Sequence, residues 1–197
     1  MHSAPITLGD AVTDAVQSYR ADANAARLFD RLEALAADAD ADALIAAAEP
    51  FRDIPEVAGP LYERIVEQRP NDARALVVLA GAYWMHGRGP DVVGALASRA
   101  IAADPSNRGA WHLWALTESA PRARVQRWAQ VTARFPDDQL AAANLADNAA
   151  SLAGAEHDPV ALGLAIETYE RLLARAEAAP QRAALEAALR TLRGWRL

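Results

Sequence analysis

The chain has neither cysteine nor lysine among its 197 residues. The lack of cysteine excludes disulfides, catalysis by a thiolate and cysteine-ligated metal sites. Aromatic residues make up only 6% of the sequence and β-branched residues are sparse, so little is available from which to build a β-sheet. No apolar run is long enough to cross a bilayer as a helix. These absences favour a helical protein without a membrane-spanning segment or a membrane partner.

The first residues do not have the pattern expected of a secretory signal. Residues 1–5, Met-His-Ser-Ala-Pro, contain no basic stretch followed by an apolar core, which a secretory signal would have. We therefore expect a cytoplasmic location.

Negative charge exceeds positive charge, and the excess is concentrated near the N-terminus. The formal net charge is −6. Residues 1–60 contain eleven acidic residues and four arginines, whereas residues 61–197 contain fifteen acidic residues and sixteen arginines. Affinity for nucleic acid depends on cations that neutralise phosphates, so an acidic chain is a poor candidate for such binding. We expect no nucleic-acid partner.

Alanine is what the sequence has in abundance, at about a quarter of all residues. It is the best helix former because it loses no side-chain entropy in a helix. Prolines and polar clusters divide the chain into segments of helix length. The predicted helices are residues 8–19, 24–37, 41–48, 55–68, 73–87, 91–103, 108–119, 122–134, 139–153, 159–177 and 180–194. The short connections between them predict antiparallel helix hairpins.

One turn pattern occurs three times: an outgoing helix, a proline, two small polar residues and a new helix. The three turns are residues 68–72, 103–107 and 134–138. The proline disfavours helix at the residue before it, and the Asn or Asp after it can cap the incoming helix. Pro70, Pro105 and Pro136 are 35 and 31 residues apart, which indicates a repeating hairpin.

This repeat resembles that of the tetratricopeptide repeat family, whose unit of about 34 residues has a bulky residue, a leucine and a small residue on its first helix. The matching residues are Leu76, Leu79 and Ala80 in one unit, Trp111, Trp114 and Ala115 in the next, and Ala142, Leu145 and Ala146 in the last. The family's first-helix tyrosine is matched by Tyr83, and the second-helix aromatic by Tyr62, Trp128 and Tyr169, with Ala97 in the remaining unit. The resemblance implies an all-α fold in which stacked antiparallel hairpins form a short right-handed superhelical solenoid.

The resemblance also implies a division of the chain into three parts. Helical repeats occupy residues 39–177. A solenoid hides apolar surface only by stacking, so its ends need capping elements. We expect the helices of residues 1–38 to cap one end and an amphipathic helix in residues 178–197 to cap the other. Whether residues 1–38 form a further repeat is left open.

A short acidic segment, residues 38–49, has acids at the spacing of a calcium-binding EF-hand loop, with Glu49 at the place of the bidentate ligand. It has Ala43 where that loop needs glycine for its sharp turn, and Pro50 follows Glu49 directly. We interpret the segment as the capped start of a helix, and we expect no metal there. The candidates for the cap are Asp38, Asp40 and Asp42.

Motifs of catalysis are not recognisable in the sequence. There is no nucleophile elbow and no glycine-rich phosphate loop, and the carboxylates are scattered. None of the four histidines has a second histidine at metal-binding spacing. We therefore expect no enzymatic activity, no cofactor and no bound metal.

A binding surface follows from the resemblance, since the concave face of this family's solenoid is lined by first helices and commonly holds peptide segments. The residues of this chain that correspond to groove positions of the family are Arg74, Val77, Trp84, His112, Leu116, Asn144 and Asp147. Trp84 is expected at the surface because the adjacent Tyr83 takes the packed position. Val77 and Gly81 stand where some members of the family have the cation and the amide of a carboxylate clamp, so binding of a chaperone tail is not expected.

Three functions are compatible with these features. The leading hypothesis is a protein–protein interaction scaffold or adaptor that binds a partner peptide or helix in the groove. The alternative is a structural helical-repeat protein that self-associates as a homodimer through an apolar end or face. The third, a metal-binding protein or an enzyme, is supported by the calcium-like segment alone.

Overall fold

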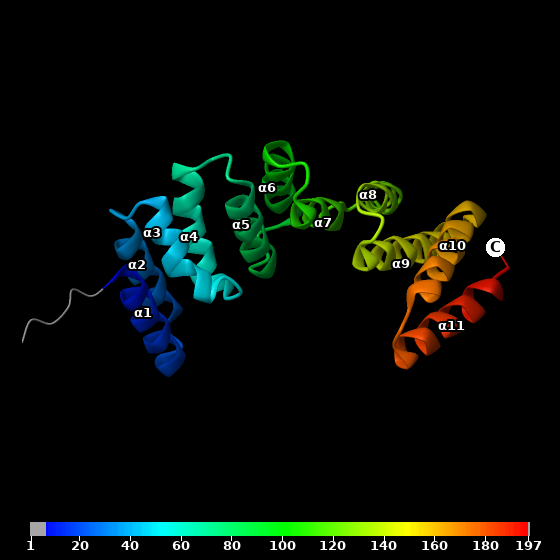
Figure 1. Cartoon of the computed structure of the whole chain (residues 1–197), viewed down its shortest axis with the longest axis horizontal. Coiled ribbons are helices and arrows are strands. Elements are labelled where there is room, and N and C mark those ends of the chain that lie inside the picture. The colour runs from blue at the N-terminus through cyan, green and yellow to red at the C-terminus, as the bar shows by residue number, and fades with distance from the viewer. Residues whose placement is uncertain (1–6, 197) are drawn as a thin grey trace, which may run out of the picture. The chain divides into compact units, whose positions relative to one another are not determined.

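The computed structural model describes residues 7–196, and within them it contains eleven α-helices, one 3-10 helix and no strand. The helices are α1 (Leu8–Asp22), α2 (Ala25–Ala36), α3 (Ala41–Ala48), η1 (Glu49–Phe51), α4 (Pro55–Gln68), α5 (Ala73–Met85), α6 (Pro90–Ala103), α7 (Arg108–Leu116), α8 (Pro121–Arg134), α9 (Gln139–Glu156), α10 (Pro159–Arg175) and α11 (Ala179–Arg193) (Figure 1). Every helix predicted from the sequence is present. The interpretation of residues 1–5 concerns a segment outside the described residues.

The chain forms two compact units, the first ending at Leu113 and the second beginning at Trp114 within α7. In the first unit α1 packs on α2, α3 on α4 and α5 on α6, and contacts of α1 with α3, α2 with α4 and α4 with α5 stack these hairpins (Figure 1). In the second unit α8 packs on α9, α9 on α10 and α10 on α11. Each unit is therefore a stack of helix hairpins, as the sequence predicts.

The three proline turns have the same geometry. Asp72, Asn107 and Asp138 are the N-caps, because each side-chain oxygen accepts a hydrogen bond from the amide three residues further on, at 3.0, 3.1 and 3.0 Å. The amide of each cap residue also donates to the carbonyl of the residue before the proline, at 3.1, 3.1 and 3.0 Å. The predicted capping role of the polar residues after proline is confirmed.

The turns at Pro70 and Pro136 are also held by an arginine from the next hairpin. The Arg99 guanidinium of α6 donates to the Pro70 carbonyl at 2.8 Å, and that of Arg175 of α10 donates to the Pro136 carbonyl at 3.0 Å. The arginines therefore tie the turn that enters a hairpin to that hairpin's second helix.

Small and large apolar side chains alternate in the interior of each unit. Leu76 and Ala80 of the first unit and Ala115 and Ala146 of the second have no exposed surface, as their assigned repeat positions predict. Trp128 is buried as well, at 2% exposure. Trp114, which stands at the leucine position of the repeat pattern, is only half-buried, and the Arg127 guanidinium covers its ring from 4.5 Å.

Helices α1, α7 and α9 each end three residues away from the predicted residue, and α1 continues to Asp22 instead of residue 19. Helix α7 stops at Leu116, not at residue 119. Two arginines of α8 donate hydrogen bonds to backbone carbonyls at this end of α7 and just after it. Arg127 donates to the Trp114 carbonyl at 2.7 Å, and Arg124 donates to the Glu118 carbonyl at 3.3 Å. Helix α9 continues to Glu156 because its sequence has no proline or polar cluster to stop it sooner, and it ends on His157 in the left-handed conformation.

Candidate functional site

Two large apolar side chains lie exposed at the C-terminal end of α5. Trp84 and Met85 are exposed to 38% and 73%. The preceding Tyr83 is half-buried, and its hydroxyl donates a hydrogen bond to Glu63 of α4 at 2.6 Å. Because consecutive residues are about 100° apart around a helix, the inward position of Tyr83 leaves Trp84 at the surface. The predicted exposure of Trp84 is confirmed.

A hollow lies on α5 one turn before Met85. Val78, Gly81 and Met85 line a cavity of about 330 Å³, together with residues that precede and begin α4. Those residues are Arg52, Asp53 and Pro55. A Cβ added at Gly81 would have no neighbour within 4 Å, so the missing side chain leaves open space. We refer to Val78, Gly81, Trp84 and Met85 as the α5 surface.

An ion pair lies at the other end of α5. The guanidinium of Arg74, a predicted groove residue, contacts the Glu49 carboxylate at 2.9 Å, and Arg52 approaches the same carboxylate at 3.5 Å. Burial raises the pKa of the nearby Tyr62 hydroxyl, and the negative charge of Glu49 adds to this effect. Arg74 is exposed, but its charge is already paired within the chain.

The other two predicted residues of the first unit are less exposed than Trp84. Val77 is half-buried, and its Cγ1 would lie 3.1 Å from a Cβ added at Gly109 of α7. The glycine thus allows Val77 to pack closely against the first turn of α7. His112, also on α7, is half-buried. Arg74, Val77 and Trp84 thus all lie on α5, with Arg74 at the end opposite Trp84 and α7 beside Val77.

The remaining predicted groove residues belong to the second unit. Leu116, the last residue of α7, is exposed to 38%. Asn144 and Asp147 lie one turn apart on α9, where the Asn144 side-chain amide donates to the Leu140 carbonyl at 2.9 Å. The Tyr169 hydroxyl of α10 donates to the Asp147 carboxylate, and burial and this carboxylate raise the pKa of Tyr169. Asp147 thus has a partner within the chain.

The acidic segment that resembles a calcium loop is a helix start held by ion pairs. Asp40 is the N-cap of α3, accepting the Ala43 amide at 2.8 Å, as one of the three predicted candidates. The Asp42 carboxylate pairs with Arg69 at 2.6 Å, which lowers the pKa of Asp42. Glu49 is engaged by Arg74 at 2.9 Å. Each of these carboxylates therefore has a structural role.

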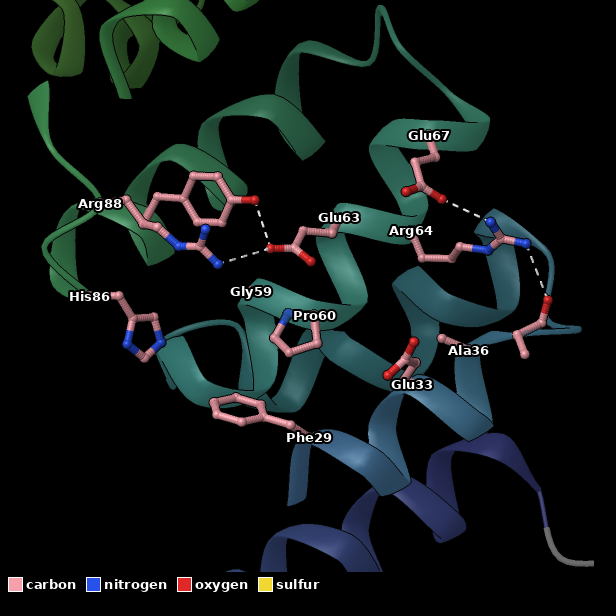
Figure 2. A pocket seen from close by; sticks show the side chains of 12 residues that line it. Phe29, Glu33, Ala36, Gly59, Pro60, Glu63, Arg64, Glu67, His86 and Arg88 are labelled. Atoms are coloured by element: carbon pink, nitrogen blue, oxygen red, sulfur yellow. Dashed lines mark hydrogen bonds and ion pairs between the residues drawn. The ribbon is translucent and has the colours of Figure 1, made fainter. Parts of the chain in front are cut away.

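A larger pocket, of about 750 Å³, lies in the first unit between α2, α4 and the end of α5 (Figure 2). This pocket was not predicted from the sequence. We call it the α2–α4 pocket; its lining includes Phe29, Glu33, Gly59, Pro60, Glu63, Arg64, Glu67, Tyr83, His86 and Arg88. These residues come from segments up to about sixty positions apart, so no local motif marks the pocket. The signals in the sequence that could have indicated it are the aromatic residue Phe29 and the acidic residues of the segments that form α2 and α4.

A linked set of polar groups forms one wall of this pocket. The Glu63 carboxylate accepts the Tyr83 hydroxyl and lies 3.8 Å from the Arg88 guanidinium, which itself lies 4.8 Å above the Tyr83 ring (Figure 2). Burial, the hydrogen bond and the charge of Glu63 raise the pKa of Tyr83 to about 12. The wall is thus a fixed network in which Tyr83 stays protonated at neutral pH.

In residues 7–196, no three His, Asp or Glu side chains gather closely enough to hold a metal ion together. Within the same residues, no helix is both long enough and apolar enough to span a bilayer.

Comparison with known proteins bears on the fold. No protein-family model matches the sequence, and no curated protein matches it. Among solved structures, the chain is similar to the crystal structure of MamA protein, with a TM-score of 0.59 and 16% identity over 87% of this chain and 97% of that one. It is also similar to a thermophilic TPR protein of Thermus thermophilus, with a TM-score of 0.54 and 15% identity over 94% and 98% of the two chains. The tetratricopeptide-like fold predicted from the sequence is thereby confirmed.

Proposed function

We propose that the protein is a scaffold that binds a partner protein, and that the α5 surface is one of its contact surfaces. The observation that carries this proposal is the exposed pair Trp84 and Met85 beside the hollow at Gly81. Tryptophan supplies a large contact area when a partner covers it, and aromatic residues are enriched at the centres of interfaces. The tetratricopeptide-like fold supports a role in protein interaction.

The composition of the α5 surface favours a partner peptide or helix with an apolar side chain. Val78, Gly81 and Met85 offer an apolar hollow, while the cations near it, Arg52 and Arg74, already share Glu49. An apolar side chain in the hollow would bury surface without separating these ion pairs. We include Val77 and His112 as neighbouring contacts in the first unit.

The proposal extends to the second unit and to the ends of the chain. Leu116, Asn144 and Asp147 are proposed contacts there. The helices of residues 1–38 and the segment 178–197 are proposed caps; in support, α11 buries Leu189 and Leu192 and exposes Arg190 and Arg193. We further propose a cytoplasmic protein that is not an enzyme and does not bind nucleic acid.

A photocrosslinking experiment tests the α5 surface. A photoreactive residue replaces Met85, and in a second variant it replaces Val92 of α6, which is also an exposed apolar residue. Irradiation in extracts of the native cells should give a crosslinked partner from position 85 and not from position 92. Adding Trp84→Ala to the position-85 variant should weaken capture roughly thirtyfold, as expected when a central anchor is removed.

The outcomes separate the hypotheses. Equal crosslinking from positions 85 and 92, or capture unaffected by Trp84→Ala in a folded protein, would refute the proposed surface. If the crosslinked product contains two copies of this chain, the structural alternative of self-association is correct. If Trp84→Ala lowers the melting temperature strongly, Trp84 serves the fold and not a partner.

A further inference from the structure

The floor of the α2–α4 pocket is apolar and open. Phe29 of α2 is exposed to 38%, although it belongs to a helix whose other large apolar residues turn inward. Gly59 and Pro60 of α4 complete the floor (Figure 2). A Cβ added at Gly59 would have no neighbour within 4 Å, so no side chain of this chain fills that space. The pocket could therefore accommodate the stem of a long side chain.

The charged groups around this floor leave negative charge available. Glu33, one turn after Phe29, has no hydrogen-bond or ion-pair partner among the described residues. The cations of the pocket are already engaged. The Arg64 guanidinium contacts Glu67 at 2.8 Å and the Ala37 carbonyl at 3.2 Å, and Arg88 lies between Tyr83 and Glu63. The pocket thus combines an apolar floor with one free carboxylate, Glu33, and a second, Glu63, which accepts the Tyr83 hydroxyl at 2.6 Å and lies 3.8 Å from the Arg88 guanidinium.

The first unit as a whole reinforces this charge. Up to Leu113 the sequence contains sixteen acidic residues and ten arginines, whereas the rest of the chain has ten of each. The excess negative charge of the protein therefore lies entirely in the unit that contains the pocket. Such a field attracts cationic partners and raises the rate at which they associate.

We infer that the α2–α4 pocket is a second docking site, which takes an arginine or lysine from a basic segment of a partner protein. The aliphatic stem of that residue would cover Phe29 and Pro60, and its charged head would lie between Glu33 and Glu63. Long basic side chains combine an apolar stem with a charged end, which matches this floor and rim. An acidic segment would be repelled by Glu33 and Glu63, because the arginines of the pocket are already engaged. The inference does not depend on the α5 surface, because neither Trp84 nor the hollow at Gly81 lines this pocket.

Nuclear magnetic resonance titrations with two peptides test the inference. The probe is an acetylated, amidated pentapeptide of alternating leucine and arginine, and its control carries glutamate in place of arginine. The basic peptide should shift the backbone amides of Phe29, Glu33 and Gly59, and the acidic peptide should not. Since exposed ion pairs are screened by salt, raising the sodium chloride concentration should weaken the binding of the basic peptide.

Three variants complete the experiment. Glu33→Gln should raise the dissociation constant by up to about fivefold, and Phe29→Ala should raise it about fivefold or more. Asp30→Asn is the matched control, because Asp30 is exposed on the same helix but does not line the pocket; it should leave the constant unchanged. The inference is wrong if neither peptide shifts the pocket amides, if the shifts lie on the α5 surface instead, or if Asp30→Asn weakens binding as much as Glu33→Gln. Unchanged binding to folded Glu33→Gln and Phe29→Ala would overturn it as well.

Discussion

Replacement of Ala80 by leucine probes how tightly the hairpins of the first unit are packed. Ala80 lies on α5 in the middle of the core and has no exposed surface. Leu76, one turn earlier on the same helix, is equally buried. The repeat pattern predicts that two helices approach each other closely at position 80, which would leave no space for the three additional carbons of leucine.

Two effects of opposite sign determine how Ala80→Leu changes the free energy of unfolding. If a void lay beside Ala80, burying three more methylene-sized groups would stabilise the protein by about 2 kcal/mol. If the site is fully packed, the larger side chain forces neighbouring groups apart and costs about 1–3 kcal/mol. The complete burial of Ala80 favours the second effect. We therefore expect Ala80→Leu to lower the free energy of unfolding by about 1–3 kcal/mol.

Urea unfolding followed by circular dichroism measures this difference. Ala102→Leu is the matched control, because Ala102 is exposed on α6 and the same substitution there should change the free energy by less than about 0.5 kcal/mol. Ala115, which is also fully buried, should behave like Ala80. If Ala80→Leu unfolds at the same urea concentration as the original protein, or at a higher one, the assigned repeat register is wrong.

Two further predictions concern individual hydrogen bonds. Asp72→Ala removes the N-cap of α5 and should lower the free energy of unfolding by about 1 kcal/mol. Asn71→Ala is the control, because Asn71 is adjacent and exposed, and it should have little effect. Equal effects of the two substitutions in urea unfolding would contradict the capping role of Asp72. Tyr83→Phe removes the bond to Glu63 and should cost about 1 kcal/mol at neutral pH. Because the pKa of Tyr83 is raised in the folded state, to about 12, its contribution is complete below about pH 10 and is lost as the pH rises through 12. The difference in unfolding free energy between the original protein and Tyr83→Phe should therefore shrink over that range, and a constant difference would contradict this account.

Local signals in the sequence were sufficient to predict the helices and the turns between them. Proline followed by two polar residues specifies a turn whose second polar side chain caps the next helix, and Asp72, Asn107 and Asp138 all do so. These are interactions over three or four residues, which neighbouring residues decide by themselves. Where no local stop signal exists, as at the end of α9, the predicted boundary was less accurate.

Part of the candidate site was also visible in the sequence. The exposure of Trp84 follows from the packed position of Tyr83, since the angle between neighbouring residues is fixed by helix geometry. The hydrogen-bond and ion-pair partners of the polar residues could not be predicted in this way. Arg74 pairs with Glu49, and Asp147 accepts the hydroxyl of Tyr169, although the sequence assigns both residues to an open groove. Charged side chains are long, and which of several nearby charges they meet depends on how the helices lie.

The sequence by itself determined that this protein is a series of short alanine-rich hairpins, because helix propensity, capping and proline act within a few residues. Only the tertiary structure decided what the surfaces of those hairpins offer. The α2–α4 pocket combines Phe29 and Glu33 with Pro60 and Glu63 because α2 packs against α4. Helix packing brings together residues about thirty positions apart in the sequence. The distance between two packed helices is not encoded in the spacing of residues within either helix.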